Sequence, residues 1–226
     1  MNIYELIGVI IGDGNIIYNK NNKQYRLEIT GNATEDKEYF INLSKIINKI
    51  SNKKPTIRER SHKKGKSLDL HINNKIFIEF LIKKIGLPCG RKTFTIKIPE
   101  KLINWKYSKH IIRGIFESDG CIFFSKSKVF KYPTYPRLEI RTSSNKLKDQ
   151  LMEILKERGF KIRLIDKCKT CKIYLSGPRM LNKWVKEIGI SNIKNKTKIN
   201  LWKKLGYYIP KTNLKQRKRI LASNYS

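Results

Sequence analysis

Leu6-Ile-Gly-Val-Ile-Ile-Gly-Asp-Gly14 and Ile112-Arg-Gly-Ile-Phe-Glu-Ser-Asp-Gly120 are two copies of one sequence pattern. Each copy contains a glycine, three mostly apolar residues, a small residue, an aspartate and a final glycine. The two aspartates, Asp13 and Asp119, lie 106 positions apart, and so do the first glycines of the two copies. A repeat at one fixed spacing indicates an internal duplication.

Each copy predicts a helix with two small residues one turn apart on a single face, where another backbone can come close. The predicted helix-interface residues are Gly8, Gly12, Gly114 and Ser118. If the two helices pack side by side, Asp13 and Asp119 meet at their C-terminal ends. Gly14 and Gly120 then follow at the position that favours a left-handed cap.

Two adjacent carboxylates at helix C-termini repel each other and oppose the helix dipoles. A divalent cation relieves both penalties, and oxygen ligands of this kind suit Mg²⁺. The predicted metal ligands are Asp13 and Asp119, with the main chain of Gly12 and Ser118. The alternative is that Gly-Asp-Gly only closes a helix with a turn, but a repeated motif needs a reason that both copies share.

At these residues the sequence resembles the LAGLIDADG family of homing endonucleases, in the form in which one chain carries both motifs. Weaker matches follow in the same order in both halves, so the resemblance covers nearly the whole chain. They pair Arg26-Leu-Glu-Ile29 with Arg137-Leu-Glu-Ile140, Lys84-Ile-Gly86 with Glu187-Ile-Gly189, and Lys92-Thr93 with Lys196-Thr197.

Hydrophobic periodicity predicts the order αββαββα in each half, an α+β class. Strands are expected near 15–20, 24–30, 56–61, 67–72, 121–127, 136–142, 161–167 and 172–176, and further helices at 34–50, 74–85, 144–158 and 178–188. We divide the chain into a first repeat (1–99), a linker (100–109), a second repeat (110–205) and a basic tail (206–226). The resemblance implies two pseudo-symmetric repeats whose antiparallel sheets form a DNA-binding saddle, with the motif helices packed at its centre.

The net charge of the chain indicates the kind of partner it binds, without reference to any protein family. The 226 residues include 50 Lys and Arg against 18 Asp and Glu, which gives a formal net charge of +32. Such a surplus indicates a polyanionic partner, and nucleic acid is the leading candidate. The chain has no apolar run of the roughly 18 residues that span a bilayer, and Met1 leads directly into the first motif. We therefore expect an intracellular protein of the cytoplasm or an organelle matrix, neither secreted nor bound to a membrane.

Alternation along the strands predicts a solvated sheet face that mixes acids, amides and arginines. Such a mixture can address base edges as well as phosphates; the alternative is a solvated face with cross-strand ion pairs. The predicted DNA-binding residues are Gln24, Arg26, Glu28, Arg58, Arg60, Asp69 and His71 in the first half, and Arg137, Glu139, Arg141, Lys161, Arg163, Lys172 and Tyr174 in the second.

The resemblance implies hydrolysis of phosphodiesters with Mg²⁺, at sites that Mn²⁺ or Ca²⁺ can also occupy. It assigns catalytic roles to Asp13 and Asp119 and to a basic residue after the last strand of each repeat. Lys92 and Lys196 match that position; the alternative is that each is a surface lysine, and Arg91, Lys194 and Lys198 compete for the role.

The chain also departs from the family pattern. Many relatives place a Gln or similar side chain after the second strand, where this chain has Gly31-Asn32 and Thr142-Ser143. Glu117, two residues before the second aspartate, is not assigned to the metal. Cys168 and Cys171 form a CxxC, but no second pair completes a zinc site.

The leading hypothesis is an intron-encoded, site-specific endonuclease that cuts double-stranded DNA at a long asymmetric target. Two different halves imply the asymmetry, and one chain with both motifs implies a monomer. The second hypothesis is the same saddle used without cleavage, as an RNA maturase that binds its own intron RNA or as a DNA-binding regulator. Intact acids in both motifs favour the first. The tail from Lys211 to Ser226, which contains the basic run Lys215–Arg219, is expected to form a short basic helix or a disordered arm that binds phosphate; the alternative is a solvated tail.

Overall fold

The structure is a computed structural model that describes residues 1–62, 65–126, 130–167 and 170–223. Both repeats follow the predicted order. The first contains α1 (Ile3–Gly12), β1 (Gly14–Asn19), β2 (Gln24–Asn32), α2 (Lys37–Ser51), β3 (Thr56–His62), β4 (Gly65–Asn73), α3 (Lys75–Glu79) and the π-helix η1 (Phe80–Ile85). The second contains α4 (Trp105–Asp119), β5 (Gly120–Ser125), β6 (Tyr135–Thr142), α5 (Asn145–Glu157), β7 (Ile162–Lys167), β8 (Thr170–Ser176) and α6 (Pro178–Glu187).

Each repeat builds one antiparallel four-stranded sheet, in the orders β1-β2-β4-β3 and β5-β6-β8-β7. Alternating residues such as Leu27 and Ile29 of β2 are buried under α2, whose Leu43 and Ile47 are buried as well. Because one face of a strand takes the apolar side chains, the intervening residues stay on the other face of the sheet. The predicted α+β class and its two repeats are confirmed.

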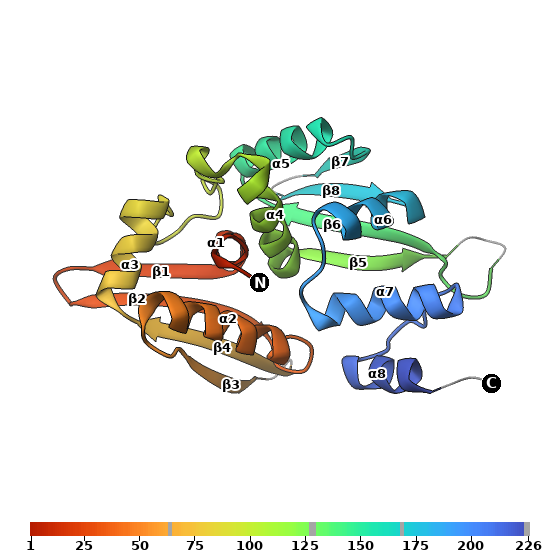
Figure 1. Ribbon diagram of the computed structural model, residues 1–226, viewed down its shortest axis with the longest axis horizontal. Helices are drawn as coiled ribbons and strands as arrows, with labels where there is room; N and C mark the ends of the chain where they lie inside the picture. The colour runs from red at the N-terminus through yellow and green to blue at the C-terminus, as the bar shows by residue number, and fades with distance from the viewer. Residues whose placement is uncertain (63–64, 127–129, 168–169, 224–226) are drawn as a thin grey trace.

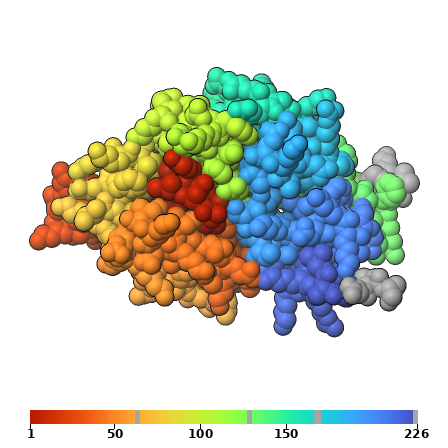
Figure 2. Space-filling model, viewed as in Figure 1, coloured from red at the N-terminus to blue at the C-terminus, as the bar shows by residue number. Residues whose placement is uncertain are grey.

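The two motif helices lie in the middle of the molecule. Figure 1 shows α1 and α4 crossing between the sheets, one sheet on each side. In Figure 2 the N-terminal segment fills the centre of the visible face, with α2 of the first repeat and the C-terminal helices around it. The duplication therefore folds as two units joined through these helices, as the sequence predicts.

The glycines after the two aspartates do not form left-handed caps. Gly14 and Gly120 are absent from the residues with positive φ among those that the structure describes, and Gly120 is extended with a φ of −105°. A Cβ at Gly14 would instead lie 2.5 Å from Cα of Ile10, and one at Gly120 would lie 2.5 Å from the carbonyl oxygen of Phe116. Each glycine is needed because the strand leaves the helix by folding directly against its last turn.

The helix expected from residue 34 begins at Lys37. The side chain of Asn32 accepts hydrogen bonds from the amides of Thr34 (2.9 Å) and Glu35 (3.0 Å), and this Asx-type turn takes up the intervening residues.

The segment between the repeats is tied to both of them. Ile98 exchanges two hydrogen bonds with the side chain of Gln150 on α5, at 2.8 and 2.9 Å. The stretch predicted as a linker, 100–109, holds the short 3₁₀ turn η2 (Glu100–Leu102) and the first residues of α4.

Two further helices, α7 (Ile193–Leu205) and α8 (Leu214–Ala222), follow α6. The sequence analysis did not predict α7, which begins inside the region assigned to the second repeat. The tail was expected to be a short basic helix or an arm, and the described part forms a helix. Within the described residues, no helix is long and apolar enough to cross a membrane.

Candidate active site

The motif helices are in contact backbone to backbone. A Cβ on Gly8 would lie 2.0 Å from the carbonyl oxygen of Ile111, and a Cβ on Gly114 would lie 2.1 Å from that of Glu5. One turn further along, a Cβ on Gly12 would lie 2.1 Å from Oγ of Ser118. All four predicted helix-interface positions therefore lie at the crossing, where no larger residue fits at the glycines.

A buried ion pair that the sequence analysis missed also joins the two helices. Glu5 on α1 is fully buried and accepts hydrogen bonds from Nε of Arg113 on α4 (2.9 Å) and from the hydroxyl of Tyr39 (3.1 Å). Arg113 also donates to the carbonyl of Ile188 at 2.9 Å. A glutamate next to the first motif and an arginine within the second were the available sequence signal, since buried charges are paired.

Asp13 and Asp119 meet at the ends of these helices. Asp13 is the C-terminal cap of α1, and Asp119 is the last residue of α4. Both line one cleft of about 490 Å³, together with Gly12, Lys92 and Arg141. Oδ2 of Asp119 lies so close to α1 that a Cβ on Gly12 would be 3.0 Å away.

The surroundings of the cleft raise the pKa of both acids. Burial, and then the charge of Asp13, raise the pKa of Asp119 to about 6, while Lys92 opposes the rise. Burial also raises the pKa of Asp13, against the lowering effect of Lys92 and Lys194. Two carboxylates thus share a partly desolvated cleft where they favour added positive charge.

Lys92 supplies part of that charge. Its Nζ donates to the carbonyls of Ile10 (2.6 Å), Ile11 (2.6 Å) and Gly12 (2.9 Å) at the end of α1. Burial lowers the pKa of Lys92 to about 8, and the two aspartates oppose this shift. The ammonium group is held where the dipole of α1 is negative, beside both acids.

Lys196 was predicted to match Lys92, but the structure places it elsewhere. It is exposed on α7, and the described residues that line the cleft do not include it. Lys194, one of its competitors, pairs with Asp36 at 2.8 Å and lowers the pKa of Asp13. Lys198 instead donates to the carbonyl of Ile122 at 3.4 Å. The sequence match with Lys92-Thr93 does not extend to the structure, because in the Lys196-Thr197 pair of α7 the threonine side chain is buried and the lysine side chain is exposed.

The start of α7 is fixed by Glu117. This buried carboxylate accepts hydrogen bonds from the amides of Ser191 (2.7 Å) and Asn192 (3.1 Å) and from Nδ2 of Asn195 (2.7 Å). Burial raises the pKa of Glu117 to about 7 against these hydrogen bonds. Glu117 therefore orients α7, and with it Lys194, which lines a small cavity together with Glu117 and Asp13.

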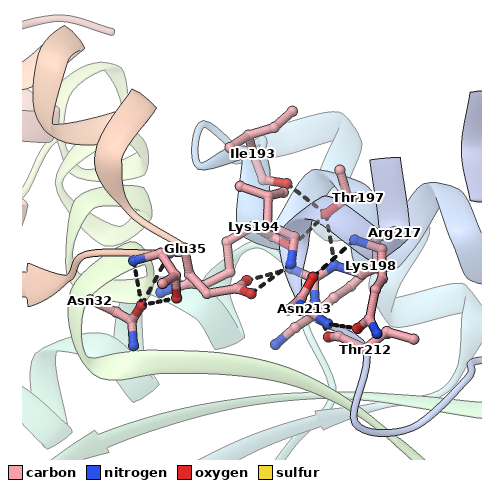
Figure 3. A network of polar contacts seen from close by, with 12 residues as sticks. Asn32, Glu35, Ile193, Lys194, Thr197, Lys198, Thr212, Asn213 and Arg217 are labelled. Carbon is pink, nitrogen blue, oxygen red and sulfur yellow. Dashed lines mark hydrogen bonds and ion pairs between the residues drawn. The ribbon is translucent and has the colours of Figure 1, made fainter. Parts of the chain in front are cut away.

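The C-terminal helix closes a polar network between the repeats, which Figure 3 shows from close by. Arg217 on α8 is buried and donates to Glu35 of the first repeat and, at 3.0 Å, to Oγ1 of Thr197 on α7. Lys218 pairs with Glu38. These contacts correct the expectation of a phosphate-binding arm for two of the basic residues, whose charges meet acids of this chain.

Arg217→Met is expected to lower the free energy of unfolding by about 3 kcal/mol, because it leaves Glu35 without its cation and removes a buried hydrogen-bond donor. Arg219→Met, on the exposed side of the same helix, is the matched control and should change stability by less than about 0.5 kcal/mol. Urea denaturation of the three proteins measures both. Equal stabilities would show that α8 does not hold the repeats together.

The predicted DNA-binding residues on the strands share the face opposite the packed helices. Ladder pairing aligns Glu28 with His71, and Glu139 with Tyr174, across the central strands. Lys161 is the exception, because it precedes β7 and lies outside the ladder. The remaining predicted residues are in strands: Gln24, Arg26, Arg58, Arg60 and Asp69, and Arg137, Arg141, Arg163 and Lys172.

The acids on this face are paired with arginines. Arg26 bonds Glu28 at 2.9 Å, Arg60 pairs with Asp69, and Arg141 pairs with Glu139. Ion pairs therefore do occupy this face: Arg60–Asp69 joins two strands, whereas the other two pairs each join residues two apart on one strand, and all three arginines remain partly exposed.

The carboxylate oxygens of Asp13 and Asp119 at the cleft fit a hard divalent cation whose coordination shell is completed by ligands from outside the protein. Among the described residues, no three His, Cys, Asp or Glu side chains gather as a metal-binding group. A cation bound here would take its anionic protein ligands from Asp13 and Asp119, and water and phosphate oxygens would supply the rest of its shell. The carbonyl of Gly12 already accepts from Lys92. Cys168 lies outside the described residues, and Cys171 is buried in β8.

Comparison with known proteins gives a family match. The sequence model of the LAGLIDADG DNA endonuclease family matches residues 3–182. No curated protein matches the chain.

Solved structures share the fold. The homing endonuclease I-WcaI bound to its DNA recognition sequence is 18% identical, with a TM-score of 0.58 over 83% of this chain and 81% of that one. I-DmoI in complex with DNA and Mn is 20% identical, with a TM-score of 0.56 over 84% and 96%. Full-length DUF199/WhiA from Thermatoga maritima is 15% identical, with a TM-score of 0.55 over 86% and 57%.

Proposed function

This chain belongs to the LAGLIDADG DNA endonuclease family, and we propose from that premise that it is an intron-encoded, site-specific endonuclease that cuts both strands of a long asymmetric DNA target. One observation supports the proposal most strongly: Asp13 and Asp119, from two different repeats, line a single cleft with Lys92. A DNA-binding protein without cleavage activity gains nothing from burying two carboxylates in one cleft, where burial raises the pKa of both.

Asp13 and Asp119 would hold divalent cations, and Mg²⁺ is the proposed cofactor. I-DmoI has been solved with DNA and Mn, and with DNA and Ca, which supports Mn²⁺ and Ca²⁺ as alternative occupants here. A bound divalent cation lowers the pKa of water and neutralises charge on a phosphate that is being attacked.

The other residues of the cleft would position DNA and stabilise charge. Lys92 would act through its charge, which favours a bound phosphate beside the acids, because three carbonyls fix its ammonium group there and accept from its N–H groups. Lys194 is the proposed basic residue of the second half, held by Asp36 and oriented through the Glu117 contacts of α7. Arg141 lines the same cleft from β6 and can contact the backbone or a base near the cut.

One chain supplies both motif helices, so we propose a monomer that acts on double-stranded DNA inside the cell. The two sheets, which differ in sequence, would each read half of the target. Residues 1–99 and 110–205 remain the proposed repeats, with 206–226 as a C-terminal extension.

The alternative is the same fold used without cleavage, as an RNA maturase or a DNA-binding regulator. The fold is shared with DUF199/WhiA as well as with homing endonucleases, so the fold alone does not decide. Both acids are present in this chain, which favours the nuclease.

The test is selection of cut products from a randomised duplex library incubated with Mg²⁺. The nuclease proposal predicts one family of related sequences, cut on both strands at a fixed position. Recovery of bound but never cut duplexes would establish the regulator instead, and binding of structured RNA without any specific duplex would establish the maturase.

A further inference from the structure

The equivalent strands β2 and β6 of the two sheets carry arginines that neighbouring side chains hold in place. Comparison of the two repeats shows which of these arginines are equivalent and which occurs in one repeat alone. Arg26-Leu-Glu-Ile29 on β2 and Arg137-Leu-Glu-Ile140 on β6 are the same tetrapeptide. Their strands also pair alike, since Arg26 lies opposite Ile17 of β1 and Arg137 lies opposite Phe123 of β5. The two arginines therefore occupy equivalent places on the two sheets.

Arg26 and Arg137, here called the outer arginines, are both fixed through their Nε atoms. Nε of Arg26 donates to Oδ1 of Asn73 at 2.9 Å, and its NH1 donates to Glu28 at 2.9 Å. Nε of Arg137 donates to Oγ of Ser125 at 2.8 Å, and its guanidinium carbon lies 5.8 Å from the centroid of the Tyr135 ring.

The repeats differ at the next position on the same face. The first repeat has Thr30, which bonds Asp69 at 3.1 Å, where the second repeat has Arg141. Glu139 consequently pairs with Arg141 and not with Arg137, whereas its counterpart Glu28 pairs with Arg26. Among the described residues, β6 of the second sheet therefore carries a second held arginine, Arg141, where β2 of the first sheet has Thr30, and Arg141 lines the cleft of the two aspartates.

A held arginine suits one kind of base. Binding of Nε by a neighbour fixes the guanidinium plane and leaves N–H groups of NH1 and NH2 at its far end, where a pair of them can match the O6 and N7 acceptors of guanine in the major groove. NH1 of Arg26 uses one of its two N–H groups on Glu28 and keeps the other. Arg26 and Arg141 keep 41% and 56% of their side-chain surface exposed, so both side chains are accessible to a partner on this face. Glu139 has only 4% of its side chain exposed, so it positions the arginine and is itself shielded from a base.

We propose that Arg26, Arg137 and Arg141 each read the guanine of one G·C pair, which gives the target two outer G·C pairs in equivalent places and one inner G·C pair in a single half. This inference rests on the proposed DNA recognition, but not on cleavage. Arg137 and Arg141 are four residues apart on β6, about 13 Å. The inner and outer G·C pairs of that half should therefore be separated by about four base-pair steps of 3.4 Å each.

The experiment is selection of bound duplexes from a randomised library in Ca²⁺, scored by binding. The wild type is expected to enrich the three G·C pairs described above. Arg141→Gln should reduce discrimination at the inner pair by about 10- to 100-fold and leave both outer pairs enriched. Arg26→Gln and Arg137→Gln should each lose the outer pair of one half only. Arg163→Gln, an exposed arginine of β7, is the matched control and should weaken binding to all sequences alike.

The variant Glu139→Gln tests whether Glu139 positions Arg141 or acts only through its negative charge. Removing an acid from a DNA-binding face raises affinity for any duplex, so a purely electrostatic role predicts tighter binding with unchanged base preference. The proposal predicts tighter non-specific binding together with a weaker preference at the inner G·C pair, because Arg141 is no longer held by a carboxylate.

Enrichment of a consensus that lacks these G·C pairs, or variants that keep every base preference of the wild type, would overturn the inference. If the wild type enriches no consensus at all, the proposed DNA recognition has failed as well. A consensus with the three G·C pairs that is bound but never cut would support this inference while contradicting the nuclease.

Discussion

Asp119→Asn is expected to slow double-strand cleavage by about a thousandfold or more, with DNA binding retained. The substitution removes one of two carboxylates that the cleft offers to a cation, and the amide that replaces it carries no charge. Asp13→Asn should have an effect of similar size, because its carboxylate shares the cleft. Since each change removes a negative charge that faces the DNA, affinity for the duplex should stay equal or rise.

The measurement is single-turnover cleavage of the selected target, with nicked and linear products counted separately. Asp149→Asn is the control, because this aspartate lies on α5 with 70% of its side chain exposed beside Lys148, and it should retain the wild-type rate. Wild-type cleavage by either Asp13→Asn or Asp119→Asn would exclude a shared site. A loss confined to one strand in each variant would show that each acid serves its own strand.

Gly8→Ala is expected to lower the free energy of unfolding by about 3 kcal/mol or more. In an ordinary helix the same change is stabilising by up to about 1 kcal/mol, so the sign itself is informative. The new Cβ would lie 2.0 Å from the carbonyl oxygen of Ile111 and 2.9 Å from Cα of Gly114. Neither atom can move without separating the two motif helices, and overpacking of this kind is costly.

Chemical denaturation of Gly8→Ala, Gly114→Ala and the double variant measures this effect. The double variant should lose less stability than the two single variants added together, because helices already pushed apart accept the second Cβ more easily. Asn200→Ala on the exposed side of α7 reports the propensity effect alone and should be neutral or slightly stabilising. Stabilisation by Gly8→Ala would show that α1 and α4 do not pack as described.

The sequence predicts the parts of the fold that depend on repeated local patterns. Both motif helices, both sheets and the faces of their strands follow from apolar periodicity, because a strand buried on one side must alternate. The meeting of Asp13 and Asp119 follows in the same way, from small residues spaced one turn apart on two helices. These features need no knowledge of distant contacts.

The parts that were missed depend on tertiary contacts. α7 buries Asn195 and Thr197 in hydrogen bonds to Glu117 and Arg217, so it lacks the apolar stripe that identifies a helix in sequence. Tertiary contacts also explain the wrong match of Lys196 to Lys92, which rested on the threonine that follows each lysine in the sequence. In α7 that threonine, Thr197, is buried and hydrogen-bonded, whereas Lys196 is exposed.

The role of the C-terminal helix α8 also depends on tertiary contacts that composition alone does not reveal. A run of basic residues usually indicates a solvated surface or a phosphate contact. Arg217 is nevertheless buried, because a glutamate from the other end of the chain lies beside it. The partner, and with it the role, is set by the fold.

The most direct test of the central claim, that Asp13 and Asp119 jointly hold the cations that cut DNA, is anomalous diffraction from Mn²⁺ in crystals of the protein with its selected target. The account predicts Mn²⁺ peaks at about 2 Å from carboxylate oxygens of both aspartates and from phosphate oxygens of the DNA. Peaks that contact neither aspartate, in crystals whose DNA lies across the two sheets, would contradict it.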